Sequence, residues 1–535
     1  MADQTRPLGA QISHMLKDRG VDVIFGIPGV HNQEMYRGIE EAGITHVLAR
    51  HEQGAGFMAD GYARATGRPG VAYVITGPGL CNIMTPMGQA YSDSVPMLVI
   101  SSCLDETAAR RGQLHQMKDQ RAAAETVCDW SHEARSAEAA YALIDRALVE
   151  FETERMRPKH VQVPIGVLEG MAAISPYASR FERWGPQRPQ RDEYASTQVA
   201  KALKEARRPI IVFGGGATLM GRTLCTKLAM ASKAATFETY AGRGLIGPDH
   251  SLHLGSMLAR PDSASVLATA DLVVVIGSEL AEVDLWRKEL GHSCKTIRID
   301  EDPENLAGLP QEEVEAFCVS SYPMMEATWE LIKDAEINTD WSDEEVIRLR
   351  QRWRAEVDAE YPGVLPVADA LKACLPDGTM IYSDMTQFAY ASKEVWDMDE
   401  PGHWHHPYGF GTLGYALPAA IGGAVGRDGQ PTIAIMGDYG FHYTMAELGV
   451  AVELGLPIPI ILWDNGKLGA IEASMVGAQI APNAVIARNP DFVKLAEAFG
   501  AAAVKPGSLD EMQAAVRQAF SAAGPTLIHV TPDIA

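Results

Sequence analysis

The sequence predicts an α/β protein with three doubly wound domains, each built on a parallel sheet. Three observations support this fold class. Short continuous apolar runs recur along the chain, helical patterns separate them, and 49 glycines and 31 prolines are spread through the sequence as many tight turns would require. Continuous apolar strands are typical of parallel sheets that helices cover on both faces. The 535 residues are enough for about three or four domains.

The composition excludes several classes of protein. A content of 47% hydrophobic and 21% charged residues is that of a globular chain rather than a disordered or fibrous one. With 46 Lys and Arg against 69 Asp and Glu, we expect neither a nucleic-acid partner nor a membrane partner, because both attract basic patches. No apolar stretch reaches about 18 residues, so no transmembrane helix is predicted. An odd number of scattered cysteines, seven in all, favours a reducing, cytoplasmic location.

The first predicted domain covers residues 1–175. A helix is expected over residues 53–66. The segment 175–192 holds four prolines or glycines and several arginines without periodicity, and we interpret it as a linker. Strands of this domain are expected at residues 21–26, 45–48, 71–75, 97–101 and 160–164.

A central domain, 192–335, and a C-terminal domain, 360–535, repeat the alternation. A charged helical stretch, 340–358, connects them. The likeness of pattern suggests that the first and third domains are related folds. Strands are expected at residues 208–213, 271–277 and 296–300 in the central domain, and at 379–383, 432–436, 459–463 and 526–530 in the C-terminal one.

One strand–helix–strand unit of the C-terminal domain predicts a metal site. Its strands end at Gly437-Asp438 and at Asp464-Asn465, and a helix with apolar positions at 445, 448 and 452 lies between them. A right-handed crossover places Asp438 and Asn465 on one edge of the sheet, where ligands bind in such folds. A carboxylate and an amide oxygen suit Mg²⁺ bound to phosphates. The alternative is that both are ordinary turn residues.

Glu52 is the second candidate. It stands between the predicted strand 45–48 and a helix of small residues that could admit a cofactor ring. It is either a carboxylate favoured by the helix dipole or a functional carboxyl group enclosed by closely packed backbone. A glycine-rich turn, Thr76–Asn82, follows the next predicted strand.

Three motifs, in this order along the chain, resemble the thiamine-diphosphate-dependent family of acetohydroxyacid synthases and 2-oxo acid decarboxylases. Gly26-Ile27-Pro28-Gly29 with His51–Ala55 is similar to its pyrimidine-side domain. Gly409–Ala420 is similar to the loop that supports the thiazolium ring. Gly437-Asp438, with Asn465 27 positions after Asp438, is similar to the metal–diphosphate motif. The resemblance spans the whole chain and implies a thiamine-diphosphate-binding fold with pyrimidine, middle and diphosphate domains.

The resemblance also implies roles for particular residues. Glu52 would hydrogen-bond the aminopyrimidine ring and start a decarboxylation that proceeds through an enamine. Asp438, Asn465 and the backbone carbonyl of Lys467 would hold Mg²⁺ on the diphosphate. The remaining cofactor-binding positions would be Pro28, Asn82, Gln387, Gly411, Leu413, Gly437, Tyr439 and Gly440. Leu413 stands where the synthases usually have Met, Tyr439 replaces the second glycine of Gly-Asp-Gly, and Thr386 and Phe388 beside Gln387 replace a frequent Gly and His.

Two histidines and a glutamine fall near the reacting carbon in the same comparison. His115 and Gln116 are proposed as catalytic residues together with Glu52, and His31 lies in a loop that faces the same site. Histidine titrates near neutrality and can move protons. The alternative is that these histidines have no such role.

A flavin is not expected. Gly214–Ala217 lacks the full G-x-G-x-x-G fingerprint. The flavin-bound synthases carry an Arg-rich segment where this chain has Gly277–Asp284.

The implied activity is decarboxylation of a 2-oxo acid without oxidation. The branch that acts on 5-guanidino-2-oxopentanoate is the most similar, on the segments 26–34, 114–116 and the acidic 278–284; Glu472 follows the metal loop where a substrate tail could reach. An acetolactate synthase-like carboligase is the alternative, and a catalytically silent cofactor-binding paralogue is a third. The family pairs the Glu-bearing domain of one subunit with the metal-bearing domain of another, so a homodimer or homotetramer is expected.

Overall fold

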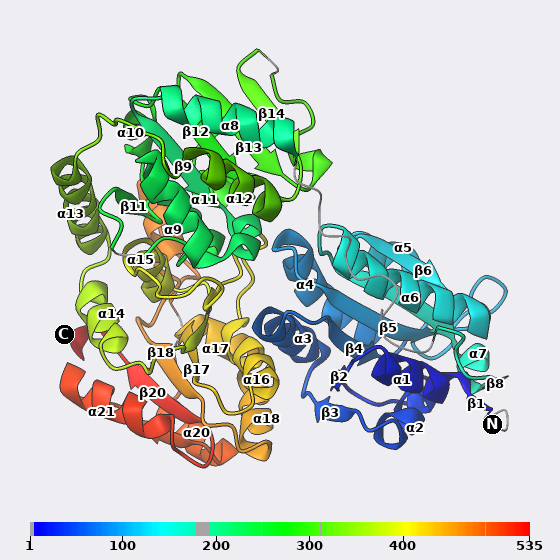
Figure 1. The fold of residues 1–535 in the computed structure, drawn as a ribbon. Helices are drawn as coiled ribbons and strands as arrows, with labels where there is room; N and C mark the ends of the chain where they lie inside the picture. Colours follow the sequence, from blue (N-terminus) through cyan, green and yellow to red (C-terminus); the bar gives the residue numbers. More distant parts are fainter. Residues whose placement is uncertain (1–4, 178–191, 248, 311, 487, 535) are drawn as a thin grey trace. The chain divides into compact units, whose positions relative to one another are not determined.

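The computed structural model describes residues 5–177, 192–247, 249–310, 312–486 and 488–534. The described chain divides into two compact units. Figure 1 shows their helices and strands, coloured along the sequence. The first comprises the residues up to 177 with 374–386 and 406–534, and the second comprises 192–373 with 387–405. No helix in these ranges is both long enough and apolar enough to cross a membrane. Most of the predicted linker, 175–192, lies outside the described residues.

The N-terminal part of the first unit is a parallel sheet with the strand order β3-β2-β4-β5-β7-β6. A small antiparallel pair, β1 with β8, lies outside that sheet. The strands are β1 (Arg6–Pro7), β2 (Val23–Gly26), β3 (Thr45–Leu48), β4 (Gly70–Val74), β5 (Met97–Cys103), β6 (Trp130–Glu133), β7 (Lys159–Pro164) and β8 (Met171–Ala172). The helices are α1 (Leu8–Asp18), α2 (Gln33–Glu41), α3 (Glu52–Thr66), α4 (Pro78–Ser92), α5 (Gln120–Glu125), α6 (Ala137–Thr153) and α7 (Ile165–Glu169).

The C-terminal part of the same unit repeats this topology. Its parallel strands run in the order β15-β17-β18-β20-β19, which matches β2-β4-β5-β7-β6. The expectation of related folds is therefore confirmed at the level of topology. The strands are β15 (Met380–Ser383), β17 (Thr432–Gly437), β18 (Pro459–Trp463), β19 (Ala502–Val504) and β20 (Thr526–Val530), and the helices are α16 (Ala416–Gly426), α17 (Asp438–Thr444), α18 (Leu448–Glu453), α19 (Gly469–Gly477), α20 (Phe492–Phe499) and α21 (Leu509–Ala519).

Helices α3 and α16, one from each half of this unit, pack closely against each other at glycines. A Cβ atom on Gly61 would overlap the carbonyl of Ala419, and one on Gly422 would overlap the carbonyl of Met58. The backbones of the two helices therefore touch, as only small residues allow. At Gly61 the space left by the missing side chain is occupied by helix α16.

The helix expected around Met445, Leu448 and Val452 is not continuous. Helix α17 ends at Thr444, a 3₁₀ turn covers Met445–Glu447, and α18 begins at Leu448. A 3₁₀ segment inside a helical stretch often marks a functional position. The turn here carries Glu447, whose side chain is almost fully buried.

The second unit contains the third parallel sheet, with the order β11-β10-β9-β12-β13-β14. The predicted charged helix 340–358 is α13. The strands of this sheet are β9 (Pro209–Phe213), β10 (Ala235–Glu238), β11 (His253–Gly255), β12 (Leu272–Ile276), β13 (Lys295–Asp300) and β14 (Val314–Cys318). The short strand β16 (Trp404–His405) also falls in the second unit but is not part of this sheet. The helices are α8 (Glu193–Glu205), α9 (Gly221–Ser232), α10 (Ser263–Leu267), α11 (Glu282–Leu285), α12 (Ser321–Ile332), α13 (Asp343–Glu360), α14 (Val364–Lys372) and α15 (Gln387–Val395).

Candidate active site

The strand order of the N-terminal sheet reverses between β2 and β4. Ligands of such sheets bind outside the carboxyl ends of the strands at this point. The loop after β2 carries the exposed Pro28, and the Asn32 side chain fixes the loop by accepting a hydrogen bond from the Gly29 N–H (2.7 Å). The loop after β4 is the glycine-rich turn that leads into α4. The topology therefore brings two of the predicted motifs to the carboxyl ends of two adjacent strands.

Glu52 is the first residue of α3 and is 9% exposed. His51 caps the helix, because its Nδ1 accepts a hydrogen bond from the Gln53 N–H (3.1 Å). Asn82 Nδ2 donates to Glu52 Oε2 (2.9 Å). The other oxygen, Oε1, makes no hydrogen bond within the described residues, and a Cβ atom on Gly79 would lie 3.3 Å from it. One carboxylate oxygen is thus held and the other remains available at the glycine-rich turn.

His31 and His115 form a pair at the same turn. Their rings meet edge to face with centroids 5.0 Å apart, and neither buried Nδ1 has a hydrogen-bond partner in the described part of the chain. His115 has a φ of 63°, and a Cβ atom on Gly77 would overlap its carbonyl oxygen. Burial lowers the pKa of His31, and the neighbouring His115 lowers it further. His31 is therefore predominantly neutral at pH 7.

Gln116 uses its side chain to hold its own loop. Its Nε2 donates to the carbonyls of Thr107 (2.9 Å) and Arg110 (2.7 Å), and its Oε1 accepts from the Gln113 N–H (3.3 Å). The Gln116 side chain thus stabilises its own loop, a role that its position in the sequence did not suggest.

The carboxyl edge of the C-terminal sheet has a different chemistry. The register pairs Gly437 with Trp463, so Asp438 and Asp464 stand at adjacent strand ends. Asn489 Nδ2 donates to Asp438 Oδ2 (2.7 Å) and to Asp464 Oδ1 (2.9 Å). His529 Nε2 lies 2.8 Å from Asp464 Oδ2.

Sequence reasoning missed this supporting chain of Asn489, Asp464 and His529. Asp464 directly precedes the predicted ligand Asn465, which is a signal that was available. Asn489 and His529 come from distant parts of the sequence, so only the fold brings them here.

Asn465 and Lys467 occupy the turn after β18. Asn465 Oδ1 accepts a hydrogen bond from the Lys467 N–H (3.2 Å), which is the turn geometry of the alternative interpretation. The Lys467 ammonium pairs with Glu472 (2.6 Å) in the first turn of α19. A turn conformation does not prevent the amide oxygen and the Lys467 carbonyl from binding a cation.

Asp384 is a further residue that the sequence did not reveal. Its carboxylate accepts hydrogen bonds from the N–H groups of Met385 and Gly414, both at 2.8 Å. A Cβ atom on Gly440 would lie 2.5 Å from Asp384 Oδ2. Burial raises the pKa of Asp384 to about 7. One buried carboxyl group therefore ties together the loop after β15, the predicted thiazolium-supporting loop and the start of α17.

The predicted supporting loop contacts helix α4. Thr412 Oγ1 donates to Gln89 Oε1 (3.2 Å), and the Gly409 N–H donates to Asp93 (3.2 Å). Gly411, in this loop, has a φ of 67°, and Leu413 is half-buried. Asn82 lies seven residues before Gln89 on the same helix, roughly 10 Å along its axis. Within one chain, Glu52 and this loop thus meet different turns of α4.

The residues present fit the groups that the resemblance implies. Asp438 is 3% exposed, forms no ion pair with Lys, Arg or His in the described ranges, and has a pKa that burial raises. A divalent cation would supply the missing positive charge. The described residues contain no group of three His, Cys, Asp or Glu that could hold a metal; the predicted set is one carboxylate, one amide and one carbonyl. For the cofactor ring, the available Oε1 of Glu52 fits a hydrogen-bond donor.

Tyr439 and Gly440 lie in the first turn of α17, after Gly437 at its N-cap. Gln387 is the first residue of α15 and belongs to the second unit.

In the central sheet, the glycine-rich loop has a packing role. The Gly216 N–H donates to the Gly277 carbonyl (2.9 Å), and a Cβ atom on Gly214 would overlap that carbonyl. Gly214–Gly216 therefore let the loops after β9 and β12 pack against each other.

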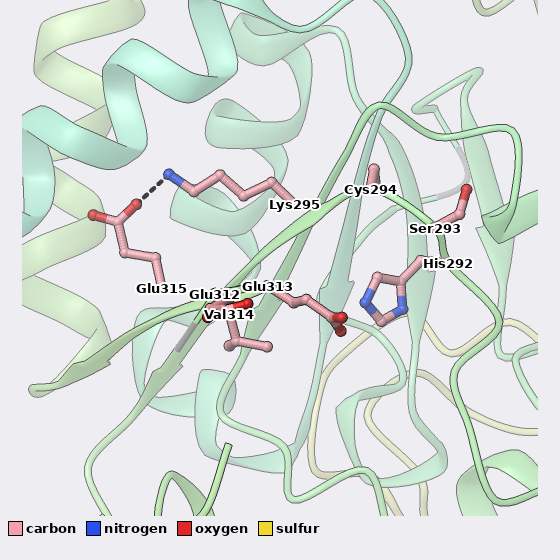
Figure 2. Close-up of a pocket in the computed structure, with 8 residues that line it drawn as sticks. All are labelled: His292, Ser293, Cys294, Lys295, Glu312, Glu313, Val314 and Glu315. Carbon is pink, nitrogen blue, oxygen red and sulfur yellow. Dashed lines mark hydrogen bonds and ion pairs between the residues drawn. The ribbon is translucent and has the colours of Figure 1, made fainter. Parts of the chain in front are cut away.

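A cavity of about 810 Å³ lies elsewhere on the second unit (Figure 2). It is bordered by the amino ends of β13 and β14, opposite to the edge where parallel sheets bind ligands. Its lining residues include His292, Cys294, Lys295 and Glu313, and Lys295 is paired with Glu315 (2.5 Å).

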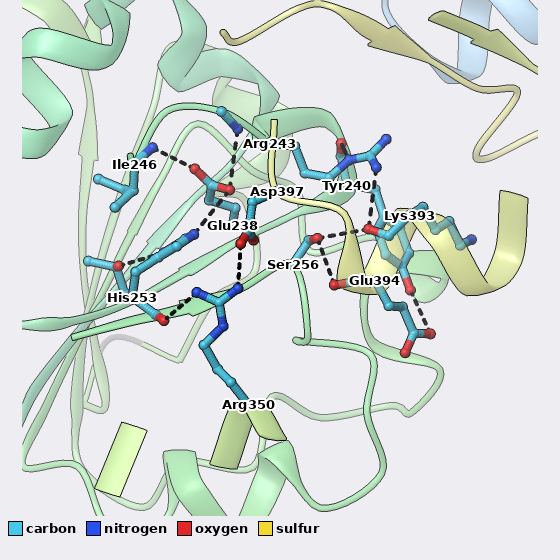
Figure 3. A network of polar contacts seen from close by, with 12 residues as sticks. Glu238, Tyr240, Arg243, Ile246, His253, Ser256, Arg350, Lys393, Glu394 and Asp397 are labelled. Atoms are coloured by element: carbon cyan, nitrogen blue, oxygen red, sulfur yellow. Dashed lines mark hydrogen bonds and ion pairs between the residues drawn. The ribbon is translucent and has the colours of Figure 1, made fainter. Parts of the chain in front are cut away.

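The second unit also contains a buried polar network (Figure 3). Glu238 accepts hydrogen bonds from the N–H groups of Gly244 (3.3 Å) and Ile246 (2.6 Å), and its carboxylate lies 3.6 Å from His253. Arg350 pairs with Asp397 (2.5 Å). Burial raises the pKa of Glu238 to about 8.

Comparison with known proteins gives these sites a common context. Three family models match: the N-terminal thiamine pyrophosphate binding domain at residues 6–123, the central domain at 196–319 and the C-terminal thiamine pyrophosphate binding domain at 384–530. The chain therefore belongs to the thiamine pyrophosphate-dependent enzymes.

Individual relatives cover the chain almost completely. A protein of Pseudomonas aeruginosa described as a probable 2-ketoarginine decarboxylase is 40% identical over 98% of this chain and 94% of its own length. The acetolactate synthase isozyme 1 large subunit of Escherichia coli is 25% identical over 98% and 93%. The mitochondrial acetolactate synthase catalytic subunit of Saccharomyces cerevisiae is 26% identical over 98% and 80%.

Proposed function

We propose that this enzyme decarboxylates a 2-oxo acid without oxidation, using thiamine diphosphate and Mg²⁺. The observation that carries the proposal is the available Oε1 of Glu52, which faces Gly79 while Asn82 holds Oε2. In the overall reaction the bond between the carbonyl carbon and the carboxylate breaks, CO₂ leaves and a proton takes its place, giving an aldehyde one carbon shorter. Bound thiamine diphosphate supplies the electron sink for the charge left by this cleavage.

Glu52 is the proposed catalytic acid–base. Its Oε1 would exchange a proton with the cofactor ring, while the hydrogen bond from Asn82 fixes the orientation of the carboxylate. A carboxyl group held in this way can contribute about 10²- to 10⁴-fold to the rate.

His31 and His115 are proposed to deliver the proton that replaces CO₂. A neutral imidazole has one N–H donor and one acceptor nitrogen, so two adjacent rings can pass a proton from solvent toward the reacting carbon. Their edge-to-face contact and unpartnered Nδ1 atoms support this role. Gln116 is proposed to shape the loop that carries His115.

Asp438, Asn465 and the carbonyl of Lys467 are proposed to hold Mg²⁺ on the diphosphate. The buried Asp438 carboxylate, without a cationic partner in the described ranges, supports the metal. The proposed cofactor contacts are Pro28, Asn82, Gln387, Gly411, Leu413, Gly437, Tyr439 and Gly440.

For the substrate we propose 5-guanidino-2-oxopentanoate, which is 2-ketoarginine. The identity with the Pseudomonas relative supports this choice. Within the site, Glu472 is the proposed partner of the guanidinium group, because it follows the metal turn and already pairs with the cationic Lys467. The acetolactate synthase relatives favour the second candidate, a carboligase that joins two oxo acids.

The test is CO₂ release from a panel of 2-oxo acids that includes 5-guanidino-2-oxopentanoate and pyruvate, with thiamine diphosphate and Mg²⁺ present. We expect CO₂ and the guanidino aldehyde from the first. An acetohydroxy acid from pyruvate as the main product would favour the carboligase, and no CO₂ from any member would overturn the proposal. Glu472→Gln should raise KM for the guanidino acid by about 10-fold or more, since a charge-assisted hydrogen bond is lost, without raising it for pyruvate.

We also propose a homodimer, or a tetramer formed from two dimers, in the cytoplasm. The resemblance to the family supports the assembly, and the absence of any disulfide among the seven cysteines, all of which lie in the described ranges, supports a reducing compartment. A fully active monomer in light scattering would contradict the assembly, and recovery of the protein outside the cytoplasmic fraction would contradict the location.

A further inference from the structure

Glu447 reaches from the C-terminal half of the first unit to the turn that carries Glu52. The Arg50 N–H lies 3.2 and 3.1 Å from its Oε1 and Oε2, and the His51 N–H donates to Oε1 (3.0 Å). The side chain is 1% exposed. These two N–H groups immediately precede Glu52, so the position of the turn depends on a carboxylate almost 400 residues away in sequence.

The surrounding sequence is shaped to admit this carboxylate. A Cβ atom on Gly54, two residues after Glu52, would overlap Glu447 Oε1. The 3₁₀ turn Met445–Glu447 lies between helices α17 and α18, and Glu447 is its last residue. The glycine and the 3₁₀ turn therefore both lie at this contact.

We infer that Glu447 is a positioning residue for Glu52: its carboxylate clamps the Arg50 and His51 N–H groups and thereby sets where the Glu52 carboxylate points. The inference rests on the proposed function of Glu52. Misplacement of a catalytic group by about 1 Å can cost 10²-fold in rate, so the clamp acts on turnover rather than on substrate binding.

Charge around the clamp is consistent with this role. Burial raises the pKa of Glu447 to about 7, the Arg50 guanidinium lowers it, and Glu52 raises it. The Arg50 guanidinium itself pairs with Glu453 and donates to the Leu48 carbonyl. Glu447 accepts hydrogen bonds from the Arg50 and His51 N–H groups, whereas the nearby Glu453 carboxylate pairs with the Arg50 side chain.

The test compares Glu447→Ala and Glu447→Gln with the matched control Glu453→Gln. Glu447→Ala should lower kcat for CO₂ release by about 10- to 10²-fold, with KM and thiamine diphosphate affinity unchanged. Glu447→Gln keeps an oxygen acceptor and should restore kcat to within about 3-fold of the original protein. Glu453→Gln removes only an exposed ion pair and should leave kcat unchanged.

Two further measurements keep the inference falsifiable. Amide hydrogen exchange of the peptide spanning residues 48–54, in protein without cofactor, should accelerate in Glu447→Ala and not in Glu453→Gln. If Glu447→Ala does not fold, Gly54→Ala displaces the same carboxylate and should give the same loss of kcat.

A folded Glu447→Ala protein with unchanged kcat would overturn the inference, as would a loss expressed only in KM or cofactor affinity. If the original protein releases no CO₂, the proposed function fails, whereas the exchange measurement still reports on the clamp.

Discussion

The two halves of the first unit share a strand order but present different chemistry at their carboxyl edges. The N-terminal edge carries Glu52 and the pair His31 and His115, whose side chains are of types that can exchange protons. The C-terminal edge carries Asp438 and Asp464, which Asn489 joins by hydrogen bonds and whose oxygen atoms are of the type that Mg²⁺ prefers. The same topology thus supplies acid–base groups on one side and oxygen ligands on the other. Function is set by side chains at the strand ends, not by the fold.

The largest effect is expected from a variant that changes the C-terminal edge alone. Asp438→Ala should abolish Mg²⁺-dependent binding of thiamine diphosphate, because it deletes the only carboxylate of the proposed ligand set. Titration calorimetry with Mg²⁺ present measures the affinity, and circular dichroism checks the fold. Unchanged cofactor affinity would show that the C-terminal edge does not hold the metal.

The next largest effect is expected from a variant that changes the N-terminal edge alone. His115→Asn should lower aldehyde formation by up to about 10²-fold while leaving cofactor affinity unchanged; asparagine tolerates the positive φ of this position. His132→Asn, a histidine stacked on Trp130, is the control. Equal rates for both variants would remove His115 from the proton path.

A smaller effect tests the support behind Asp438. Asn489→Ala should weaken Mg²⁺ affinity by about 10-fold, as loss of a residue that orients a metal ligand typically does. Asn483, whose side chain donates a hydrogen bond to the Ala481 carbonyl, gives the control Asn483→Ala. The same affinity in both variants would mean that Asn489 does not orient Asp438.

The smallest effect lies outside both edges, in the second unit. The folded-state pKa of Glu238 is about 8, above its ordinary value of 4.5, so the folded protein holds the extra proton. Its contribution to stability is complete below pH 4.5 and is lost as the pH rises through 8. The free energy of unfolding should fall over this range with a slope of at most about 1.4 kcal/mol per pH unit from this group. In Glu238→Gln the slope should be shallower.

Denaturant unfolding at several pH values measures that slope. The exposed Glu336→Gln is the control and should keep the original pH dependence. Identical slopes in the two variants would contradict the assigned protonation of Glu238.

Much of this molecule could be predicted from its sequence, because local signals determine it. The strands at 45–48, 459–463 and 526–530 have the predicted bounds, since each is a short apolar run between clear turn residues. Adjacent placement of the strand ends bearing Asp438 and Asn465 follows from the handedness of the crossover.

What could not be predicted depends on contacts between distant segments. Asp384, Glu447 and Asn489 act through partners 30, 397 and 51 positions away, and no local pattern marks them. The periodicity of apolar residues predicted one continuous helix through Met445–Glu447, where the structure has a 3₁₀ turn. The Glu447 carboxylate in this turn contacts the Arg50 and His51 N–H groups, a distant contact that periodicity does not reveal. The small residues of α3 were interpreted by composition alone, whereas the fold places α16 against Gly61.

The central claim is that the N-terminal edge supplies proton chemistry through Glu52. The most direct measurement is the rate of proton–deuterium exchange at C2 of bound thiamine diphosphate in the original protein and in Glu52→Gln, after matched cofactor loading. Glutamine keeps the shape and the contact with Asn82 but cannot exchange a proton. The account predicts that cofactor binding survives while exchange slows by about 10²- to 10⁴-fold. Exchange at the original rate would show that Glu52 is only the first residue of a helix.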